Sequence, residues 1–223
     1  MKKELIKDLI DYLSEYVTEN KSQKIDEVLA GRTRYLSVVL EDIFQTHNAS
    51  AVVRSCECFG VQDLHIIEKR NQFSPMNSVA KGSAKWLDFY RYKTTSECFK
   101  DLKKSGYKIV ATTPHKKSVD LHELPIDQKM VLVFGTEGEG LSKEAMNLAD
   151  EYVTIPMVGF TESFNISVSV AICLYDITQR LRDLPVDWQL SQAEILDIKL
   201  NWLKKVVPGS DIHQKRFLEG KGA

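Results

Sequence analysis

Apolar residues recur at helical spacing at the N-terminal end of the chain. Leu9 and Leu13 belong to a set of leucines and isoleucines on one side of a helical projection, while lysine, aspartate and glutamate fall on the opposite side. This spacing predicts an amphipathic helix over 3–17. A shorter pattern of the same kind predicts a second helix over 22–29. We therefore expect residues 1–31 to form an N-terminal helical extension.

Short apolar runs rich in β-branched residues alternate with helical patterns through the middle of the chain. Because two parallel strands need a crossover connection, usually a helix, this alternation predicts an α/β fold with a buried, mainly parallel sheet. The predicted strands cover 36–40, 63–67, 88–92, 108–112, 130–134 and 152–155. The helices predicted between them cover 48–59, 96–104 and 142–149.

The C-terminal third of the chain is predicted to be mostly helical. One long pattern predicts a helix over 164–181, and a second helix is expected over 191–206. The dipeptide Pro208-Gly209 predicts a loop, which we expect to be followed by a basic tail. We assign residues 32–183 to the α/β domain and 184–223 to a C-terminal helical extension.

The charge of the chain does not by itself indicate a nucleic-acid-binding protein. Its 223 residues include 30 basic and 31 acidic side chains, for a net charge of -1. A binder of RNA with this balance must concentrate its cations locally, and the alternative for each basic cluster is an ordinary solvated face. Two clusters stand out, one formed by Arg32 and Arg34 and the other by Arg180, Arg182, Lys204, Lys205, Lys215 and Arg216.

The cysteines and the N-terminus indicate a cytoplasmic protein. One Cys-x-Cys pair, Cys56 and Cys58, has neither a second pair nor a nearby histidine to complete a zinc site, so we expect no metal. We expect buried, reduced thiols at all four cysteines. No apolar run approaches the roughly 20 residues needed to cross a bilayer, and acidic residues stand where a signal peptide would be apolar.

A glycine-rich segment, Gly135 to Ser142, follows a predicted strand. It resembles a phosphate-binding loop only superficially, because it contains Glu137 and Glu139 and lacks a terminal Gly-Lys-Ser/Thr. Carboxylates would repel a triphosphate, but they suit hydroxyl donors such as a ribose, or a positively charged ligand. A plain connection between a strand and a helix is the alternative.

Two further segments carry polar residues at the expected carboxyl ends of strands. In the segment from Ile155 to Ser169, proline and glycine interrupt strand pairing, and either Ser163 or Asn165 is expected to cap the following helix. In the segment from His47 to Gly60, we expect Asn48 to be the N-cap of a helix that ends at a glycine. The alternatives are simple capping and, for Arg54, an ordinary surface arginine.

Together the three segments resemble the motifs of the TrmH/SpoU family of SPOUT RNA 2'-O-methyltransferases. The similarity covers residues 32 to 182, and the Asn-Ile-Ser-Val-Ser stretch after Ile-Pro-Met is its most specific part. The motifs read Asn48-x5-Arg54-x4-Phe59-Gly60, then Phe134-Gly135-x-Glu137-Gly138-x-Gly140-Leu141, then Ile155-Pro156-Met157-x5-Ser163-x-Asn165-Ile166-Ser167-Val168.

The resemblance implies a C-terminal deep trefoil knot, a homodimer, S-adenosyl-L-methionine as cofactor and tRNA as partner. The catalytic residues that it implies are Arg54, Asn48, Glu137, Ser163 and Asn165. The cofactor-binding residues that it implies are Thr112, Gly135, Glu137, Gly138, Ile155, Met157, Phe164 and Asn165. The RNA-binding residues expected from it are Arg32, Arg34, Arg54, Arg180 and Arg182.

The implied reaction is methylation of a ribose 2'-hydroxyl in tRNA, at guanosine 18 of the D-loop. Since a guanidinium group keeps its charge in proteins, we expect Arg54 to hold a phosphate and to stabilise the developing alkoxide rather than to act as a base. Three alternatives remain: methylation of ribosomal RNA or of the tRNA wobble position, a non-catalytic RNA-binding protein, and a nucleotide-binding α/β enzyme.

Overall fold

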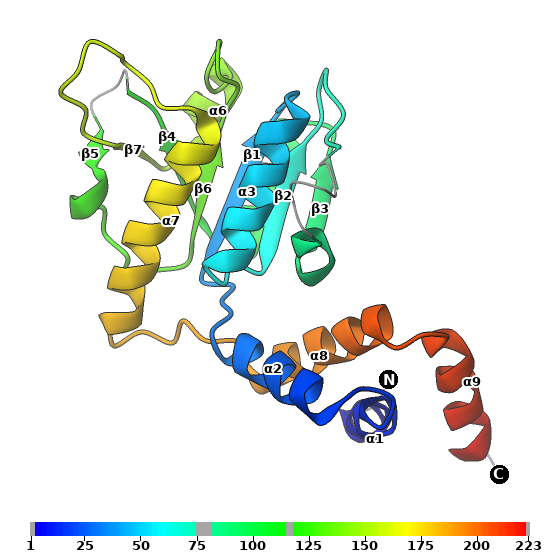
Figure 1. Ribbon diagram of the computed structural model, residues 1–223. Coiled ribbons are helices and arrows are strands. Elements are labelled where there is room, and N and C mark those ends of the chain that lie inside the picture. The colour runs from blue at the N-terminus through cyan, green and yellow to red at the C-terminus, as the bar shows by residue number, and fades with distance from the viewer. Residues whose placement is uncertain (1–2, 75–81, 115–117, 222–223) are drawn as a thin grey trace. The chain divides into compact units, whose positions relative to one another are not determined.

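The computed structural model describes residues 3–74, 82–114 and 118–221. Within these ranges the chain divides into two compact units. One unit combines Met1–Arg32 with Gln189–Ala223, and the other is Thr33–Trp188. Figure 1 shows that the larger unit is built on a sheet covered by helices, as expected for an α/β fold.

The larger unit contains a seven-stranded sheet in which all the described strand pairs are parallel. The strands are β1 (Leu36–Glu41), β2 (Asp63–Ile67), β3 (Asp88–Tyr92), β4 (Lys108–Thr112), β5 (Val119–Asp120), β6 (Met130–Phe134) and β7 (Glu151–Thr154). Their order is β3-β2-β1-β6-β4-β7-β5. Six of the seven were predicted. The exception is β5, a two-residue strand at the edge of the sheet.

Helices cover both faces of this sheet, as Figure 1 shows for α3 and α7 on one face. Side chains of β1 alternate between the two faces: Leu36, Val38 and Leu40 pack under α3 and α7, whereas Val39 packs under α5. Full burial of such a side chain contributes about 1.5 to 3 kcal/mol. The elements flanking the sheet are α3 (Thr46–Cys58), η1 (Ser83–Trp86), α5 (Thr95–Lys104), η2 (Leu121–Glu123), α6 (Lys143–Leu148) and α7 (Ile166–Asp183).

The structure shows which residues cap the helices α3 and α7. The helix α3 begins at Thr46, two residues earlier than expected, with Gln45 as its N-cap, so Asn48 lies inside the first turn. The prediction of Asn48 as the cap was therefore wrong, and its side chain is free for other contacts. Of the two candidate caps of α7, Asn165 is the one used. Gly60 adopts a φ of 80°, as predicted for a glycine that ends a helix.

Three of the four cysteines are buried, as expected. The exception is Cys58, which is exposed at the end of α3, so the prediction of a buried thiol was wrong there. Burial raises the pKa of the Cys173 thiol to about 12, which keeps that side chain protonated at neutral pH.

The smaller unit consists of four helices packed around a separate core. Leu9, Leu13, Leu29 and Leu203 are almost completely buried in it. A capping box in which Ser191 and Glu194 exchange hydrogen bonds begins the third of these helices. The helices are α1 (Lys3–Ser14), α2 (Glu19–Ala30), α8 (Gln192–Val206) and α9 (Ser210–Lys221).

The last helix, α9, was not predicted, since the segment after Pro208 was expected to be a loop and a tail. Gly209 does make a turn, with φ 65°, but a helix follows it directly. Aromatic contacts with α1 and with the turn after it hold this helix: the ring centroids of Tyr12 in α1 and Phe217 are 5.3 Å apart, and those of Tyr16 in the turn and His213 are 3.9 Å apart. The prediction failed because tertiary contacts, rather than a strong helical pattern, stabilise α9.

Across the described ranges, no helix combines the length and the apolar character required to cross a membrane. The order of the strands does not by itself test the deep trefoil knot, which stays a prediction.

A buried histidine on β2 allows a test of the packing between β2 and β3. The His65 ring is 6% exposed and stacks on Tyr90, with ring centroids 4.8 Å apart. The Tyr92 hydroxyl lies 3.4 Å from its Nδ1 atom. Burial lowers the pKa of His65 from 6.5 to about 4, because the neutral ring is favoured away from water.

We expect His65 to make the protein less stable as the pH falls from 6.5 towards 4. In that window the unfolded chain binds a proton at this side chain and the folded chain does not, which removes up to about 3 kcal/mol from the free energy of unfolding. Urea titrations at pH 7 and pH 4.5 would measure the loss. A His65→Phe variant should lose less over the same interval, and an identical loss in both proteins would contradict the assignment.

Candidate functional site

The loops that carry the three motifs all meet the same edge of the sheet. In a parallel sheet the carboxyl ends of the strands lie together, and ligands bind in the crevice beyond them. The motif loops follow β6 and β7 and precede α3, which itself follows β1. Since β1 pairs with β6, the loop between β1 and α3 and the loop after β6 start from adjacent strands.

Three side chains, one from each motif, form a hydrogen-bonded cluster at this edge. Asn48 donates from Nδ2 to Oε1 of Glu137 at 2.9 Å. Asn165 donates from Nδ2 to Oδ1 of Asn48 at 3.2 Å, and also to Oε1 of Glu137. The contacts join residues that are 89 and 117 positions apart in the chain. The convergence of the three motifs, expected from the sequence, is therefore present in the structure.

Both amides of this cluster are oriented by further hydrogen bonds. Asn165 is the N-cap of α7, and its Oδ1 accepts from the backbone N of Ser167 at 2.9 Å and from Ser167 Oγ at 2.6 Å. With its oxygen engaged, only the amide nitrogen can face Glu137. Asn48 also donates to Oε1 of Gln45 at 2.6 Å, so Glu137 accepts hydrogen bonds from two oriented amides.

The backbone of the glycine-rich loop is closed on itself. Thr136 and Gly140 exchange two backbone hydrogen bonds, of 3.1 and 3.0 Å. A Cβ atom added at Gly135 would lie only 2.1 Å from the carbonyl oxygen of Gly140, and Gly140 itself has φ 67°. These two positions therefore require glycine, and the tight closure fixes the place from which Glu137 extends.

A cavity of about 400 Å³ lies beside the loop after β7. Two of the residues expected to bind a cofactor, Ile155 and Met157, line it, and Thr112 ends the neighbouring strand with its Oγ1 donating to the carbonyl of Val133 at 2.8 Å. The lining residues are Pro114, Thr154, Ile155, Pro156, Met157, Gly159, Thr161 and Glu162.

This cavity is open to solvent and offers both apolar surface and a carboxylate, a combination that suits a ligand with a cationic group. Pockets for such ligands usually enclose between about 300 and 1,000 Å³ and combine an apolar lining with a few polar groups. Here Ile155, Pro156 and Met157 supply the apolar surface, and Glu162 supplies a carboxylate. Among the described residues, no group of three or more histidine, cysteine, aspartate or glutamate side chains could hold a metal ion.

Comparison with known proteins identifies the family. The model of the SpoU rRNA Methylase family matches residues 35–175. The chain is 46% identical over 198 residues to the tRNA (guanosine(18)-2'-O)-methyltransferase of Borreliella burgdorferi, covering 89% of this chain and 91% of that protein. The chain belongs to the SpoU methylase family.

Two further proteins are similar to this chain over most of their length. The tRNA (guanosine(18)-2'-O)-methyltransferase of Thermus thermophilus is 34% identical over 194 residues, which cover 84% of this chain and 98% of that protein. The crystal structure of the TrmH/SpoU tRNA modifying enzyme of A. aeolicus superposes with a TM-score of 0.76 at 31% identity, covering 85% of this chain and 98% of that one.

The arginine of the first SpoU motif, Arg54, does not join the cluster within this chain. It follows Asn48 by six residues, so it lies about 9 Å further along α3 and about 120° away around the helix axis. Its side chain is exposed. Among the described residues, no hydrogen bond links its guanidinium to Asn48, Glu137 or Asn165.

Three of the arginines expected to bind RNA are instead engaged inside the protein. Arg32 is completely buried, with its guanidinium 5.2 Å from the ring centroid of Trp202. Arg34 bridges two carboxylates, and Arg180 donates to two backbone carbonyls and to one carboxylate. Burial argues against direct phosphate binding by Arg32, while Arg34 and Arg180 are partly exposed but already engaged in these contacts. Arg182 is exposed.

The remaining residues expected at the site are close to members of the cluster in the sequence. Gly138, Ser163 and Phe164 are exposed near Glu137 and Asn165 in the sequence, where a ligand could reach them. Sequence reasoning missed Glu162 and Pro114 as lining residues. It also missed Glu41 and Asp42, although two acidic residues directly after an apolar strand are a signal that could have been noticed.

A pair of glycines in the same loop allows a matched test of its closure. Because a Cβ at position 135 would overlap the Gly140 carbonyl, we expect Gly135→Ala to lower the free energy of unfolding by about 1 to 3 kcal/mol. Nothing lies within 4 Å of a Cβ added at Gly138, so Gly138→Ala is the control and should change it little. Chemical denaturation measures both, and equal effects would contradict the close approach.

Proposed function

We propose that this SpoU methylase transfers a methyl group from S-adenosyl-L-methionine to the ribose 2'-hydroxyl of guanosine 18 in tRNA. The observation that carries the proposal is the cluster of Asn48, Glu137 and Asn165, which joins all three motifs in one place. The names of the similar proteins supply the nucleotide and the class of RNA. Ribosomal RNA and the tRNA wobble position are the alternative targets.

The residues around the cavity fit the proposed cofactor. Its sulfonium group carries a positive charge, which favours a site near the Glu162 carboxylate, and its adenosine part suits the apolar surface of Ile155 and Met157. When bound, S-adenosyl-L-methionine supplies a methyl group that is already activated for displacement. The protein therefore has mainly to align the 2'-hydroxyl and to assist loss of its proton.

Arg54 is the residue proposed to act on the RNA. Its guanidinium would pair with a phosphate next to the target ribose and stabilise the negative charge that develops on the 2'-oxygen. The proton leaves to that phosphate or to water, since a guanidinium cannot accept it. Glu137, held by Asn48 and Asn165, would orient the ribose hydroxyls as a hydrogen-bond acceptor, and exposed Ser163 lies two residues from Asn165 as an additional contact.

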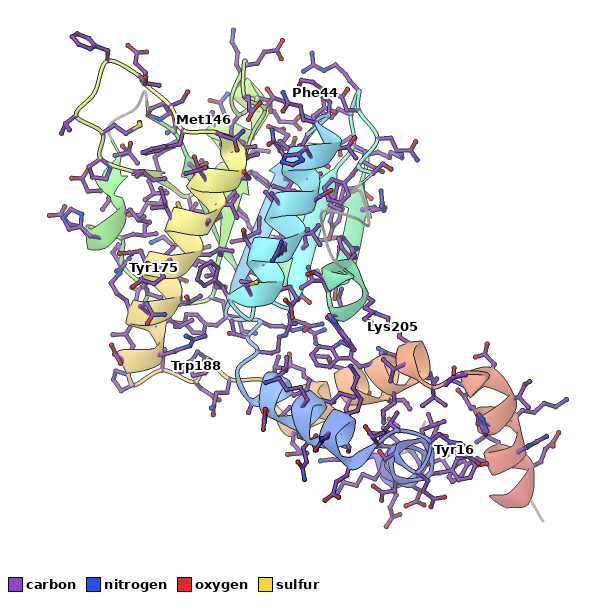
Figure 2. The ribbon with its side chains drawn as sticks, in the orientation of Figure 1. Tyr16, Phe44, Met146, Tyr175, Trp188 and Lys205 are labelled. Carbon is purple, nitrogen blue, oxygen red and sulfur yellow. The ribbon has the colours of Figure 1, made fainter. Side chains whose placement is uncertain are left out.

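The proposed enzyme is a homodimer in which Arg54 of one subunit serves the pocket of the other. Support comes from an exposed, partly apolar face on α3 and α7, two helices that lie side by side in Figure 1. Tyr175 is 61% exposed and Val168, seven residues earlier on the same side of α7, is 44% exposed. Figure 2 labels Tyr175 on α7 and Phe44 next to the first turn of α3. The exposed Arg54 and Cys58 lie four residues apart on α3.

Contacts to the rest of the tRNA are proposed for exposed Arg182 and Lys205 and for half-buried Lys204. Arg182 lies in the last turn of α7, and Lys204 and Lys205 lie in the last turn of α8. Cations that bind phosphates make affinity fall with salt. Together with its tRNA substrate, the enzyme would act in the cytoplasm.

The substrate assignment predicts methylation at a single ribose. We expect the purified protein to methylate an unmodified tRNA transcript with S-adenosyl-L-methionine, and mass spectrometry of nuclease fragments should find the methyl group on guanosine 18. A tRNA with 2'-deoxyguanosine at that position has no acceptor oxygen and should receive almost no methyl group. Equal methylation of the deoxy transcript, or methylation at another nucleotide, would overturn the assignment.

The shared site predicts complementation between two inactive variants. Arg54→Ala and Asn165→Asp should each lower turnover by at least about a hundredfold. If the two residues come from different subunits, mixed dimers contain one intact site, so refolding the variants together should restore about a quarter of wild-type activity.

The choice of Asn165→Asp keeps a good N-cap at the start of α7, which preserves the fold. If Arg54 served the pocket of its own subunit, every site in a mixed dimer would carry one substitution and no activity would return. If Arg54→Ala retained normal turnover and lost only RNA affinity, its proposed role in the transfer step would be wrong.

A further inference from the structure

Two neighbouring carboxylates lie at the carboxyl end of β1, close to the loop that carries Glu137. Glu41 is 3% exposed and Asp42 is 4% exposed. A buried carboxylate is unfavourable unless hydrogen-bond donors or cations compensate for the lost water. The identity of their partners therefore shows which parts of the fold these two side chains hold.

Glu41 accepts four hydrogen bonds, two of them from Ser142. Its Oε1 accepts from Ser142 Oγ at 2.7 Å, from Lys69 Nζ at 3.0 Å and from Thr95 Oγ1 at 2.5 Å. Its Oε2 accepts from the backbone N of Ser142 at 2.8 Å. Burial alone would raise the pKa of Glu41, but these hydrogen bonds outweigh burial and lower it, so the side chain stays ionised.

Ser142 is the residue at which the glycine-rich loop ends and α6 begins. It is the N-cap of α6, and its Oγ accepts from the backbone N of Ala145 at 3.1 Å. Both the hydroxyl and the amide of this cap are bound by Glu41. The carboxylate therefore fixes the far end of the loop that starts at Gly135, while β6 fixes its near end.

Asp42 reaches the same loop by a second route. It is the only described residue other than glycine with positive φ, at 58°, a conformation that aspartate tolerates better than most residues. Its Oδ1 accepts from the backbone N atoms of Lys69, Arg70 and Asn71, at 3.2, 2.8 and 2.9 Å. Its Oδ2 accepts from Arg70 Nε at 2.9 Å.

The segment that Asp42 organises carries two cations toward the site loop. Arg70, held at Nε by Asp42, donates from Nη2 to Oε2 of Glu139 at 2.8 Å. Lys69 bridges Glu41 and Glu144, at 3.0 and 3.2 Å. The glycine-rich loop is thus anchored at Ser142 by Glu41 and at Glu139 by Arg70, on either side of its Gly140 turn.

We propose that Glu41 is a positioning residue for methyl transfer, acting through Ser142, and that Asp42 supports it through Arg70 and Glu139. Neither carboxylate touches the cluster of Asn48, Glu137 and Asn165. They hold the backbone from which Glu137 extends, so that its carboxylate stays within reach of both amides. The proposal rests on the proposed function for the reaction itself, while the anchoring of the loop is independent of it.

The first test measures the loop and the cofactor site separately from RNA. Glu41→Gln keeps the shape of the side chain but cannot accept from all four donors. We expect hydrogen exchange at the backbone amides of Gly140 and Ser142 to become at least about tenfold faster in the free protein. In calorimetry, the dissociation constant for S-adenosylhomocysteine should rise about tenfold, because small displacements of a positioned loop weaken binding and transfer.

Two control variants separate positioning from general stability. Thr95→Val removes another hydrogen bond to Glu41 without touching the loop, and Glu144→Gln removes the other carboxylate that contacts Lys69. Both should leave S-adenosylhomocysteine binding within about twofold of wild type, even where thermal stability falls. If Thr95→Val changed exchange and binding as much as Glu41→Gln, the effect would be general loosening and the proposal would be wrong.

A further variant keeps the proposal testable if Glu41→Gln fails to fold. The Arg70 side chain is 65% exposed, so Arg70→Gln should fold while losing the contact with Glu139. We expect faster exchange at Gly140 and a several-fold weaker binding of S-adenosylhomocysteine. Unchanged values in Arg70→Gln, or in a folded Glu41→Gln protein, would overturn the proposal. Because exchange is measured without RNA or cofactor, a failure of the tRNA assignment would leave this result intact.

Discussion

The site depends on one asparagine, Asn165, whose amide oxygen and amide nitrogen bind different partners. The oxygen of Asn165 caps α7, and its nitrogen donates to Glu137 and to Asn48. Because the amide is planar, fixing the oxygen on the helix end fixes the direction of the nitrogen. The same side chain therefore fixes both the start of α7 and the geometry of the polar cluster. An aspartate could cap the helix equally well, but it could not donate to a carboxylate.

Two glycines position the other side of the cluster, the Glu137 carboxylate. The loop after β6 can bring Glu137 to the amides only because it turns back on itself within a few residues, where a side chain at Gly135 would collide with the Gly140 carbonyl. The hydrogen-bonded closure gives this exposed loop an ordered backbone. Order at a position open to ligand is what preorganised sites require, since a mobile carboxylate would lose entropy on each binding event.

Much of the fold followed from hydrophobic periodicity, because strands such as β1 and β6 are buried on both faces and therefore read as continuous apolar runs. The three residues of the polar cluster were named from the resemblance of their motifs to a known family, since the pattern of apolar and polar residues alone predicted only helix caps and loops at these positions. The partners of Glu41 and Asp42 could not be found this way. They depend on side chains from β1, the segment after β2, and α6 meeting in space, and no local pattern encodes that. The burial of Arg32 could not be predicted for the same reason: local sequence does not distinguish an arginine that lies over a buried tryptophan from one in solvent.

The pairing of β1 with β6 also bears on how the chain acquires its fold during synthesis. Leu36 pairs with Met130, and most of the sheet lies in the sequence between them or after them. Strands β1, β2 and β3 can pair as they leave the ribosome, but one side of β1 stays open until β6 has been translated. A nascent chain of this protein thus exposes an apolar strand edge for the time needed to make about a hundred residues, on the order of 5 to 20 seconds.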